Sequence, residues 1–163
     1  MIEVLDGKVD RETRERFIRD IRSLSYNINV TDGIDGDDVS GASASLEADS
    51  YIFNKLYAII NDKFNDKLKD LQIVDAYVNC FYPNERPSWH VDSDELDAIT
   101  VLYYANTTEY DEGGTEFLDT STDEVRSILP VHGRIVLFPS YLMHRATSFR
   151  DKQRFTVAFK YKK

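Results

Sequence analysis

Between Leu71 and the C-terminus, the sequence is a succession of short apolar or alternating segments separated by turn residues. Alternation with period two is typical of strands, and Gly, Pro, Asn and Asp between such segments mark turns. Many short strands and few helices predict a sandwich or barrel, here a double-stranded β-helix of the jelly-roll type. We expect eight strands, at residues 73–82, 88–92, 98–106, 115–118, 124–129, 134–138, 143–147 and 153–162.

The N-terminal part predicts two helices that support this mostly β core. Asp10 can cap the first, whose apolar residues recur at helical spacing: Phe17, Ile18, Ile21 and Leu24. The second starts near Asp49 or Ser50 and has an apolar stripe of Ile52, Leu56, Ile59, Ile60 and Phe64. A short strand is expected at residues 2–5. We expect a single domain over residues 1–163, with support helices at about 10–66 and the jelly-roll core at about 71–162.

Residues 31–45 combine Gly, Asp and Ser without periodicity, which predicts a loop. The aspartate spacing resembles a calcium-binding loop, but no glutamate follows at the position that such a loop requires. Two interpretations stay open for this segment: a plain surface loop, or a flap over the active site.

Composition and charge argue against a nucleic-acid-binding protein, a membrane protein and a disulfide-bonded protein. The net charge of −9 argues against a nucleic-acid partner, because such binding depends on Lys and Arg neutralising phosphates. No apolar run approaches the ~20 residues that a membrane span needs, and the first residues lack the layout of a signal peptide. Cys80 is the only cysteine, so no internal disulfide can form. We therefore expect a cytoplasmic protein.

The most informative motif is His90-Val91-Asp92. On a strand, side chains two residues apart point the same way, so this imidazole and this carboxylate can reach one metal ion. His144 is the candidate third ligand. Two His and one carboxylate leave coordination positions open, an arrangement that suits non-haem Fe(II) enzymes.

Arg154 follows ten residues after His144, in an alternating run that ends near the C-terminus. Arg154, Thr156 and Ala158 share one face of that predicted strand. A planar guanidinium can bind a carboxylate through two parallel hydrogen bonds, and a neighbouring hydroxyl can add a third. Arg154 and Thr156 therefore form a candidate carboxylate clamp.

His90-x-Asp92, His144 and Arg154 together resemble the Fe(II)/2-oxoglutarate-dependent dioxygenase superfamily, and within it the prolyl 4-hydroxylase-like branch. Four further segments strengthen the resemblance, which covers roughly Val74 to Tyr161. These are Cys80-Phe81-Tyr82-Pro83, the strand from Thr100 to Asn106, Gly113-Gly114, and the run from Gly133 to Ser140.

The resemblance implies an iron enzyme that hydroxylates a C–H bond and releases succinate and CO₂. Its cofactors would be Fe(II), 2-oxoglutarate and O₂, with ascorbate as a reductant. His90, Asp92 and His144 would be the catalytic metal ligands. The 2-oxoglutarate would be bound by Arg154, Thr156, Tyr82 and Tyr104. Strand alternation lets only one of Tyr103 and Tyr104 face inward, and the choice of Tyr104 rests on the resemblance.

The substrate is left open by the sequence, because one fold serves many reactions. A prolyl residue of a peptide or protein is the leading hypothesis. The same chemistry on a free amino acid, a small metabolite or a nucleobase is the first alternative. A metal-binding jelly-roll protein without turnover is the second, and a cupin-type isomerase or a dioxygenase without 2-oxoglutarate is the third. Arg154 distinguishes the 2-oxoglutarate-dependent enzyme from the second and third alternatives, since a metal site that binds no 2-oxoglutarate has no need of a carboxylate clamp.

Arg145, next to His144, is a candidate for positioning substrate at the mouth of the site.

Overall fold

The computed structural model describes residues 1–28 and 41–163, which fold into two sheets and two helices. The first part of the described chain contains β1 (Glu3–Leu5), α1 (Arg11–Arg22), β2 (Asn27–Ile28), β3 (Ala42–Ser45) and α2 (Tyr51–Leu68). The second part contains β4 (Gln72–Phe81), β5 (Ile99–Tyr104), β6 (Thr115–Asp119), β7 (Glu124–Ile128), β8 (Ile135–Pro139), β9 (His144–Ala146) and β10 (Arg154–Lys162).

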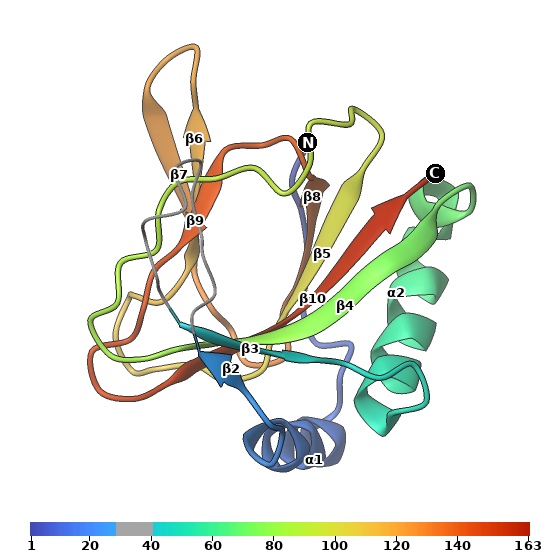
Figure 1. Cartoon of the computed structure of the whole chain (residues 1–163), viewed down its shortest axis with the longest axis vertical. Helices are drawn as coiled ribbons and strands as arrows, with labels where there is room; N and C mark the ends of the chain where they lie inside the picture. The colour runs from blue at the N-terminus through green and yellow to red at the C-terminus, as the bar shows by residue number, and fades with distance from the viewer. Residues whose placement is uncertain (29–40) are drawn as a thin grey trace.

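The two sheets face each other across the middle of the molecule (Figure 1). Within the described residues, the larger sheet has seven strands in the order β1-β8-β5-β10-β4-β3-β2, and the smaller has three in the order β7-β6-β9. The pairs are antiparallel. β10 lies at the centre of the larger sheet, between β4 and β5. This arrangement confirms the expected mostly β fold with a jelly-roll core and N-terminal helices.

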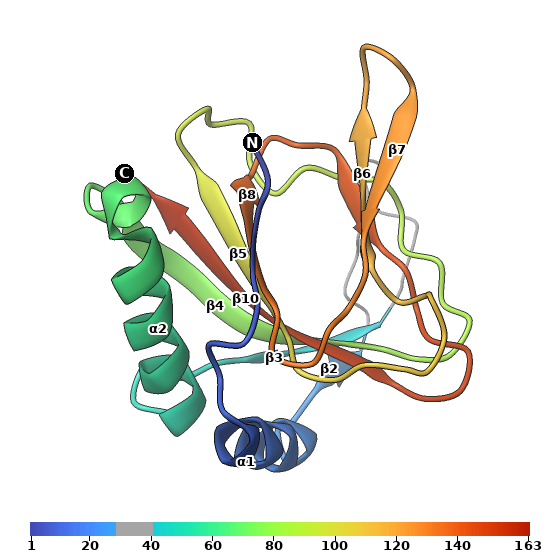
Figure 2. The same ribbon diagram turned by 180° about the vertical axis from the view of Figure 1, so that it is seen from behind.

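Both helices cover the outer face of the larger sheet, away from β6, β7 and β9 (Figure 2). Asp10 caps α1 by accepting a hydrogen bond from the Thr13 backbone N–H at 2.9 Å, and Ser50 caps α2 in the same way through Phe53 at 3.2 Å. The predicted apolar stripes supply the buried faces: Phe17, Ile21, Leu56 and Ile60 are fully buried. Neither helix in the described part of the chain is long and apolar enough to cross a membrane.

Alternation along β10 divides the interior into two regions. Phe155, Val157 and Phe159 pack with the helices in the main apolar core. The intervening residues point to the space between the two sheets, where Arg154, Thr156 and Lys160 line a cavity. The central strand therefore contributes one face to stability and the other to the site.

Two sequence predictions about strands are wrong. Residues 42–45 form strand β3, although a loop was expected across 31–45. Their alternating Ala and Ser residues bury Ala42 and Ala44 and turn Ser43 and Ser45 toward the cavity. Residues 88–92 form no continuous strand, only a bridge between His90 and His144. The calcium and flap interpretations concern residues that fall largely outside the described ranges.

Truncating the buried face of α2 tests the role of the support helices. Leu56→Ala should lower the free energy of unfolding by about 3 kcal/mol, because it removes fully buried methyl groups and leaves a cavity. Urea unfolding followed by circular dichroism measures this change. Lys55→Ala, at the neighbouring exposed position, is the matched control and should change stability by less than about 0.5 kcal/mol. Equal effects of the two substitutions would contradict the packing assigned to α2.

Candidate active site

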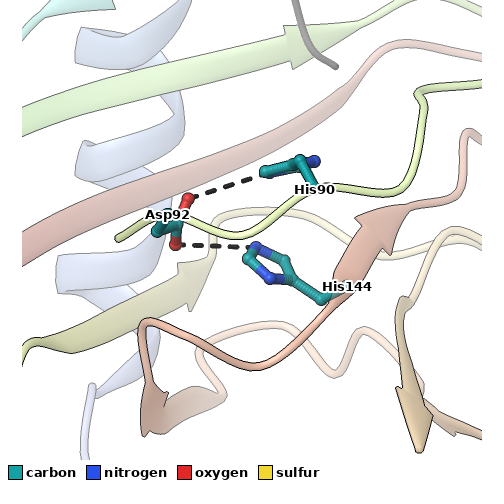
Figure 3. A group of neighbouring side chains, drawn as sticks. All are labelled: His90, Asp92 and His144. Atoms are coloured by element: carbon teal, nitrogen blue, oxygen red, sulfur yellow. Dashed lines mark ion pairs between the residues drawn. The ribbon is translucent and has the colours of Figure 1, made fainter. Parts of the chain in front are cut away.

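His90, Asp92 and His144 come together in one cluster, with ligand atoms that lie within 4.8 Å of one another. Figure 3 shows both imidazole rings directed at the Asp92 carboxylate. His90 Nε2 lies 3.7 Å from Asp92 Oδ1, and His144 Nε2 lies 3.5 Å from Asp92 Oδ2. Two imidazole nitrogens and one carboxylate oxygen therefore converge, which is the donor set of a non-haem iron site.

Backbone pairing holds the two histidines in place. The N–H of each residue donates to the carbonyl of the other at 2.9 Å, which forms the His90–His144 bridge. His90 Nδ1 lies 3.1 Å from the Ser88 carbonyl, and His144 Nδ1 lies 2.8 Å from the Leu142 carbonyl. A carbonyl can only accept, so Nδ1 carries the proton and Nε2 keeps its lone pair for a metal.

Asp92 is 8% exposed and is held by several polar groups. Thr100 Oγ1 donates to its Oδ2 at 2.7 Å and lies 2.9 Å from Ser140 Oγ, while the Lys160 ammonium pairs with the same carboxylate. Burial acts to raise the pKa of Asp92, but Lys160, His144 and the Thr100 hydroxyl outweigh it and bring the pKa below 3.8. The carboxylate is therefore ionised and oriented at neutral pH.

His144 is 5% exposed and is packed among aromatic rings. The centroid of its ring lies 4.8 Å from that of Phe138 and 5.9 Å from that of Phe117. Burial lowers the pKa of His144 from 6.5 to about 4, against the opposing effect of the Asp92 carboxylate. The imidazole is therefore neutral at physiological pH, as metal ligation requires.

Arg154 is 1% exposed, and its guanidinium donates to the backbone carbonyls of Gly113 and Gly114 and to Thr115 Oγ1. It forms no ion pair with a carboxylate of the described residues. Burial lowers the pKa of Arg154, but a guanidinium stays charged at neutral pH. A buried cation without an anionic partner in residues 1–28 and 41–163 favours an anionic ligand in the cavity that it lines.

The two glycines Gly113 and Gly114 allow their backbone carbonyls to accept hydrogen bonds from the Arg154 guanidinium. Gly113 has φ of +74°, and a Cβ on it would lie 2.0 Å from the buried Phe149 ring. A Cβ on Gly114 would lie 2.5 Å from the Ile128 carbonyl oxygen. Side chains at these positions would therefore displace the two carbonyls that accept from Arg154.

The two adjacent tyrosines of β5 point in opposite directions, as alternation predicts. Tyr104 is fully buried beside Arg154, with its ring centroid 5.4 Å from the guanidinium carbon, and its hydroxyl donates to Thr115 Oγ1 at 2.7 Å. Tyr103 faces the helices and contacts the Phe17 ring edge-on. Thr156 pairs directly with Tyr104 across the sheet and lines the cavity.

Tyr82, which the resemblance implies as a residue that binds the cosubstrate, does not line this cavity. It follows the end of β4, its side chain is 40% exposed, and its backbone N–H donates to Glu85 at 2.6 Å. Phe81, the last residue of β4, lines the cavity instead, with its ring centroid 5.6 Å from the Arg154 guanidinium. The difference follows from the end of the strand, because β4 ends at Phe81 and Tyr82 belongs to the turn that comes next.

A cavity of about 360 Å³ contains the three candidate metal ligands, Arg154 and Thr156. The sequence reasoning missed several polar residues that also line it: Asn27, Ser43, Ser45, Asp75, Tyr77, Asn79 and Lys160. Lys160 could have been predicted from the sequence, because strand alternation puts it on the same face of β10 as Arg154 and Thr156. Ser43 and Asn79 could not have been predicted in this way, because they reach the cavity through the pairing of β3 with β4, which the sequence does not reveal.

Comparison with known families identifies the class. The model of the 2OG-Fe(II) oxygenase superfamily matches residues 76–162, which is more than half of the chain. The chain therefore belongs to this superfamily, whose members use Fe(II), 2-oxoglutarate and O₂. A search among curated proteins finds no sequence match.

Solved structures share the fold at low sequence identity. HygX from Streptomyces hygroscopicus, with nickel and 2-oxoglutarate bound, superposes with a TM-score of 0.77 at 14% identity over 98% of this chain and 82% of that one. A prolyl hydroxylase from Trichoplax adhaerens, in complex with a hypoxia inducible factor peptide fragment, gives 0.75 at 17% identity over 98% and 82%. A Pseudomonas putida prolyl-4-hydroxylase gives 0.67 at 14% identity over 99% and 92%.

The residues in the cavity fit the cofactors of this superfamily. His90, Asp92 and His144 supply the donor set for Fe(II), and Arg154 is a buried cation without a protein carboxylate partner among the described residues. When bound, the metal and 2-oxoglutarate supply the activation of O₂. With the family match, this makes the chain a 2-oxoglutarate-dependent non-haem iron dioxygenase.

Removing the Thr100 hydroxyl should weaken metal binding. Thr100→Val deletes the 2.7 Å hydrogen bond that orients Asp92, and such supporting contacts are typically worth about tenfold or more in metal affinity. Chelator competition with Mn(II) measures the dissociation constant without turnover. Thr100→Ser keeps a hydroxyl and should bind Mn(II) within about twofold of the parent protein. Unchanged affinity in Thr100→Val would contradict the orienting role.

Acidification should destabilise the metal-free protein between pH 6.5 and about 4. In the folded state His144 stays neutral until about pH 4, whereas an unfolded histidine binds a proton near 6.5. The stability that this residue contributes is therefore complete above pH 6.5 and is lost as the pH falls toward 4. Urea unfolding at a series of pH values measures this slope. His144→Gln should show a shallower slope, and an identical slope would contradict the shift.

Proposed function

We propose that this enzyme hydroxylates a C–H bond of a prolyl residue in a peptide or protein. The overall reaction consumes one O₂ and one 2-oxoglutarate. One oxygen atom enters the hydroxyl group of the product and the other enters succinate, with loss of CO₂. Two electrons come from the C–H bond and two from the oxidative decarboxylation, so the reaction balances without another reductant.

The oxygenase chemistry in this proposal rests on one observation, the cavity that the His90–Asp92–His144 cluster shares with Arg154. The cluster binds Fe(II) and leaves coordination positions open for ligands. Arg154 binds a carboxylate of 2-oxoglutarate, and Thr156 provides a neighbouring hydroxyl. The Tyr104 ring packs beside the guanidinium, with its centroid 5.4 Å from the guanidinium carbon. The protein contributes the orientation and the charge of the groups that hold the cofactors.

A peptide substrate is supported by the likeness in fold to two prolyl hydroxylases, one of them in complex with a peptide fragment. The acidic loops of residues 92–97 and 109–116 disfavour a polyanion such as nucleic acid. Their charge is partly offset, because Glu95 pairs with Lys162, and Asp97 with Lys163, at 3.0 and 2.6 Å.

A small polar molecule is the second candidate substrate. The cavity wall formed by β2, β3 and β4 presents Asn27, Ser43, Ser45 and Asn79, whose side chains form no hydrogen bond with other described residues. Unpaired amides and hydroxyls suit a ligand rich in hydrogen-bonding groups. A solved structure of HygX with hygromycin B bound shares the fold, with a TM-score of 0.72.

Succinate release tests the proposal. Fe(II)-loaded enzyme with 2-oxoglutarate and O₂ should release succinate faster when a proline-containing peptide is added than with a matched alanine peptide. Arg154→Met should raise the KM for 2-oxoglutarate by at least about tenfold, because it removes a charge-assisted bond. His144→Ala should abolish turnover.

Mass spectrometry of the peptide provides the decisive readout. A gain of one oxygen atom on proline supports prolyl hydroxylation. Succinate release that no peptide accelerates, but that both variants lose, would keep the oxygenase chemistry and contradict the peptide substrate. In that case polyhydroxylated small molecules become the candidates to assay.

A further inference from the structure

A second cavity adjoins the active site. It has a volume of about 400 Å³ and lies between residues 84–87 and residues 145–150, with Glu112 in its wall. Ala146 lines both this cavity and the one that contains the candidate metal ligands. We call it the arginine groove, because Arg86, Arg145 and Arg150 line it. A substrate longer than one residue can therefore occupy both spaces at once.

Arg145 belongs to the groove and is tied to the metal cluster through the backbone. It is next to His144 on β9, and Trp89 is next to His90, so both flank the bridge that joins the two histidines. The Arg145 guanidinium carbon lies 4.4 Å from the Trp89 ring centroid, and its Nε donates to Glu116 at 2.7 Å. Contacts on two sides hold this guanidinium in one orientation.

The acceptors of the groove are already used by the protein. Glu85 accepts from the backbone N–H groups of Gly41 and Tyr82, at 2.8 and 2.6 Å. Glu112 accepts from the backbone N–H and the Nε of Arg150, both at 2.8 Å. Glu112 is thereby the ion-pair partner of Arg150, and Glu116 is that of Arg145, whereas Arg86 forms no ion pair with a described residue.

The donors, in contrast, are in surplus. Arg86 is exposed and makes no ion pair or hydrogen bond with another described residue. Arg145 and Arg150 each use Nε, and their terminal Nη groups donate to no described residue. Arg86 therefore offers a guanidinium without an ion-pair partner among the described residues, and the Nη groups of Arg145 and Arg150 add N–H donors beside it. A carboxylate offers only acceptors and so matches these donors.

We propose that the arginine groove binds the carboxylate of an acidic residue near the prolyl residue that is hydroxylated. This inference rests on the proposed peptide substrate and specifies its sequence preference. Anchoring in the groove places the rest of the peptide across Ala146, toward the metal cluster. One carboxylate suffices, and the net charge of −9 disfavours a longer polyanion.

Binding without turnover tests the groove. The probes are fluorescent proline-containing peptides in which a single glutamate is moved residue by residue away from the proline, with glutamine and lysine at the same position as comparisons. The enzyme carries Mn(II) and 2-oxoglutarate and is kept free of O₂. Fluorescence anisotropy gives the dissociation constants. We expect at least one glutamate position to bind about tenfold more tightly than its glutamine counterpart.

Variants link this preference to the groove. Arg86→Gln should remove most of the glutamate preference, and Arg86→Glu should shift it toward lysine, while Mn(II) affinity stays unchanged. Arg126→Gln, at an exposed position on β7, is the control and should keep the preference.

The outcomes separate this inference from the proposed function. The assignment of the groove as a carboxylate site would fail if peptides bound equally with glutamate or glutamine, or if the preference survived in Arg86→Gln. Either result would leave the proposed prolyl hydroxylation in place. If no peptide binds while succinate release persists, both the groove and the peptide substrate fail. Tighter binding of a single-stranded oligonucleotide, lost in Arg86→Gln, would overturn the assignment and identify a phosphate site.

Discussion

The burial of the Arg154 charge organises much of this structure. A guanidinium that is 1% exposed must have acceptors, and two of them are the carbonyls of Gly113 and Gly114. Those carbonyls are reachable only because neither residue has a side chain, and because Phe149 packs against Gly113. The start of β6 is thereby joined to β10, which brings the smaller sheet against the larger one where the site lies.

Local patterns in the sequence were enough to predict most of the fold and the centre of the site. The first helix begins at the predicted cap, Asp10, and the second at Ser50, one of the two predicted starts, because capping is decided within one turn of the chain. The inward and outward faces of β10 follow from period two alone, and the same rule separates Tyr103 from Tyr104. Local patterns alone did not predict that His144 would join His90 and Asp92. That prediction also relied on a motif whose spacing resembles a known family.

The remaining parts depend on contacts between distant segments. Residues 42–45 are small and polar, so nothing local marks them as a strand, and they become one by pairing with β4. Tyr82 was placed in the site by resemblance, but β4 ends at Phe81 and turns the next side chain outward. Lys160 is a different case. Its position on the cavity face of β10 could be predicted from strand alternation, but its ion pair with Asp92, which is distant in the sequence, could not.

The bridge between His90 and His144 gives the site two sides with different tasks. On one side, the imidazoles and Asp92 form the candidate metal-binding cluster, and the cation Lys160 pairs with Asp92. On the other, Trp89 and Arg145 hold a guanidinium in place next to a groove rich in donors. Local positive charge from such cations can attract an anionic ligand even though the chain carries a net charge of −9.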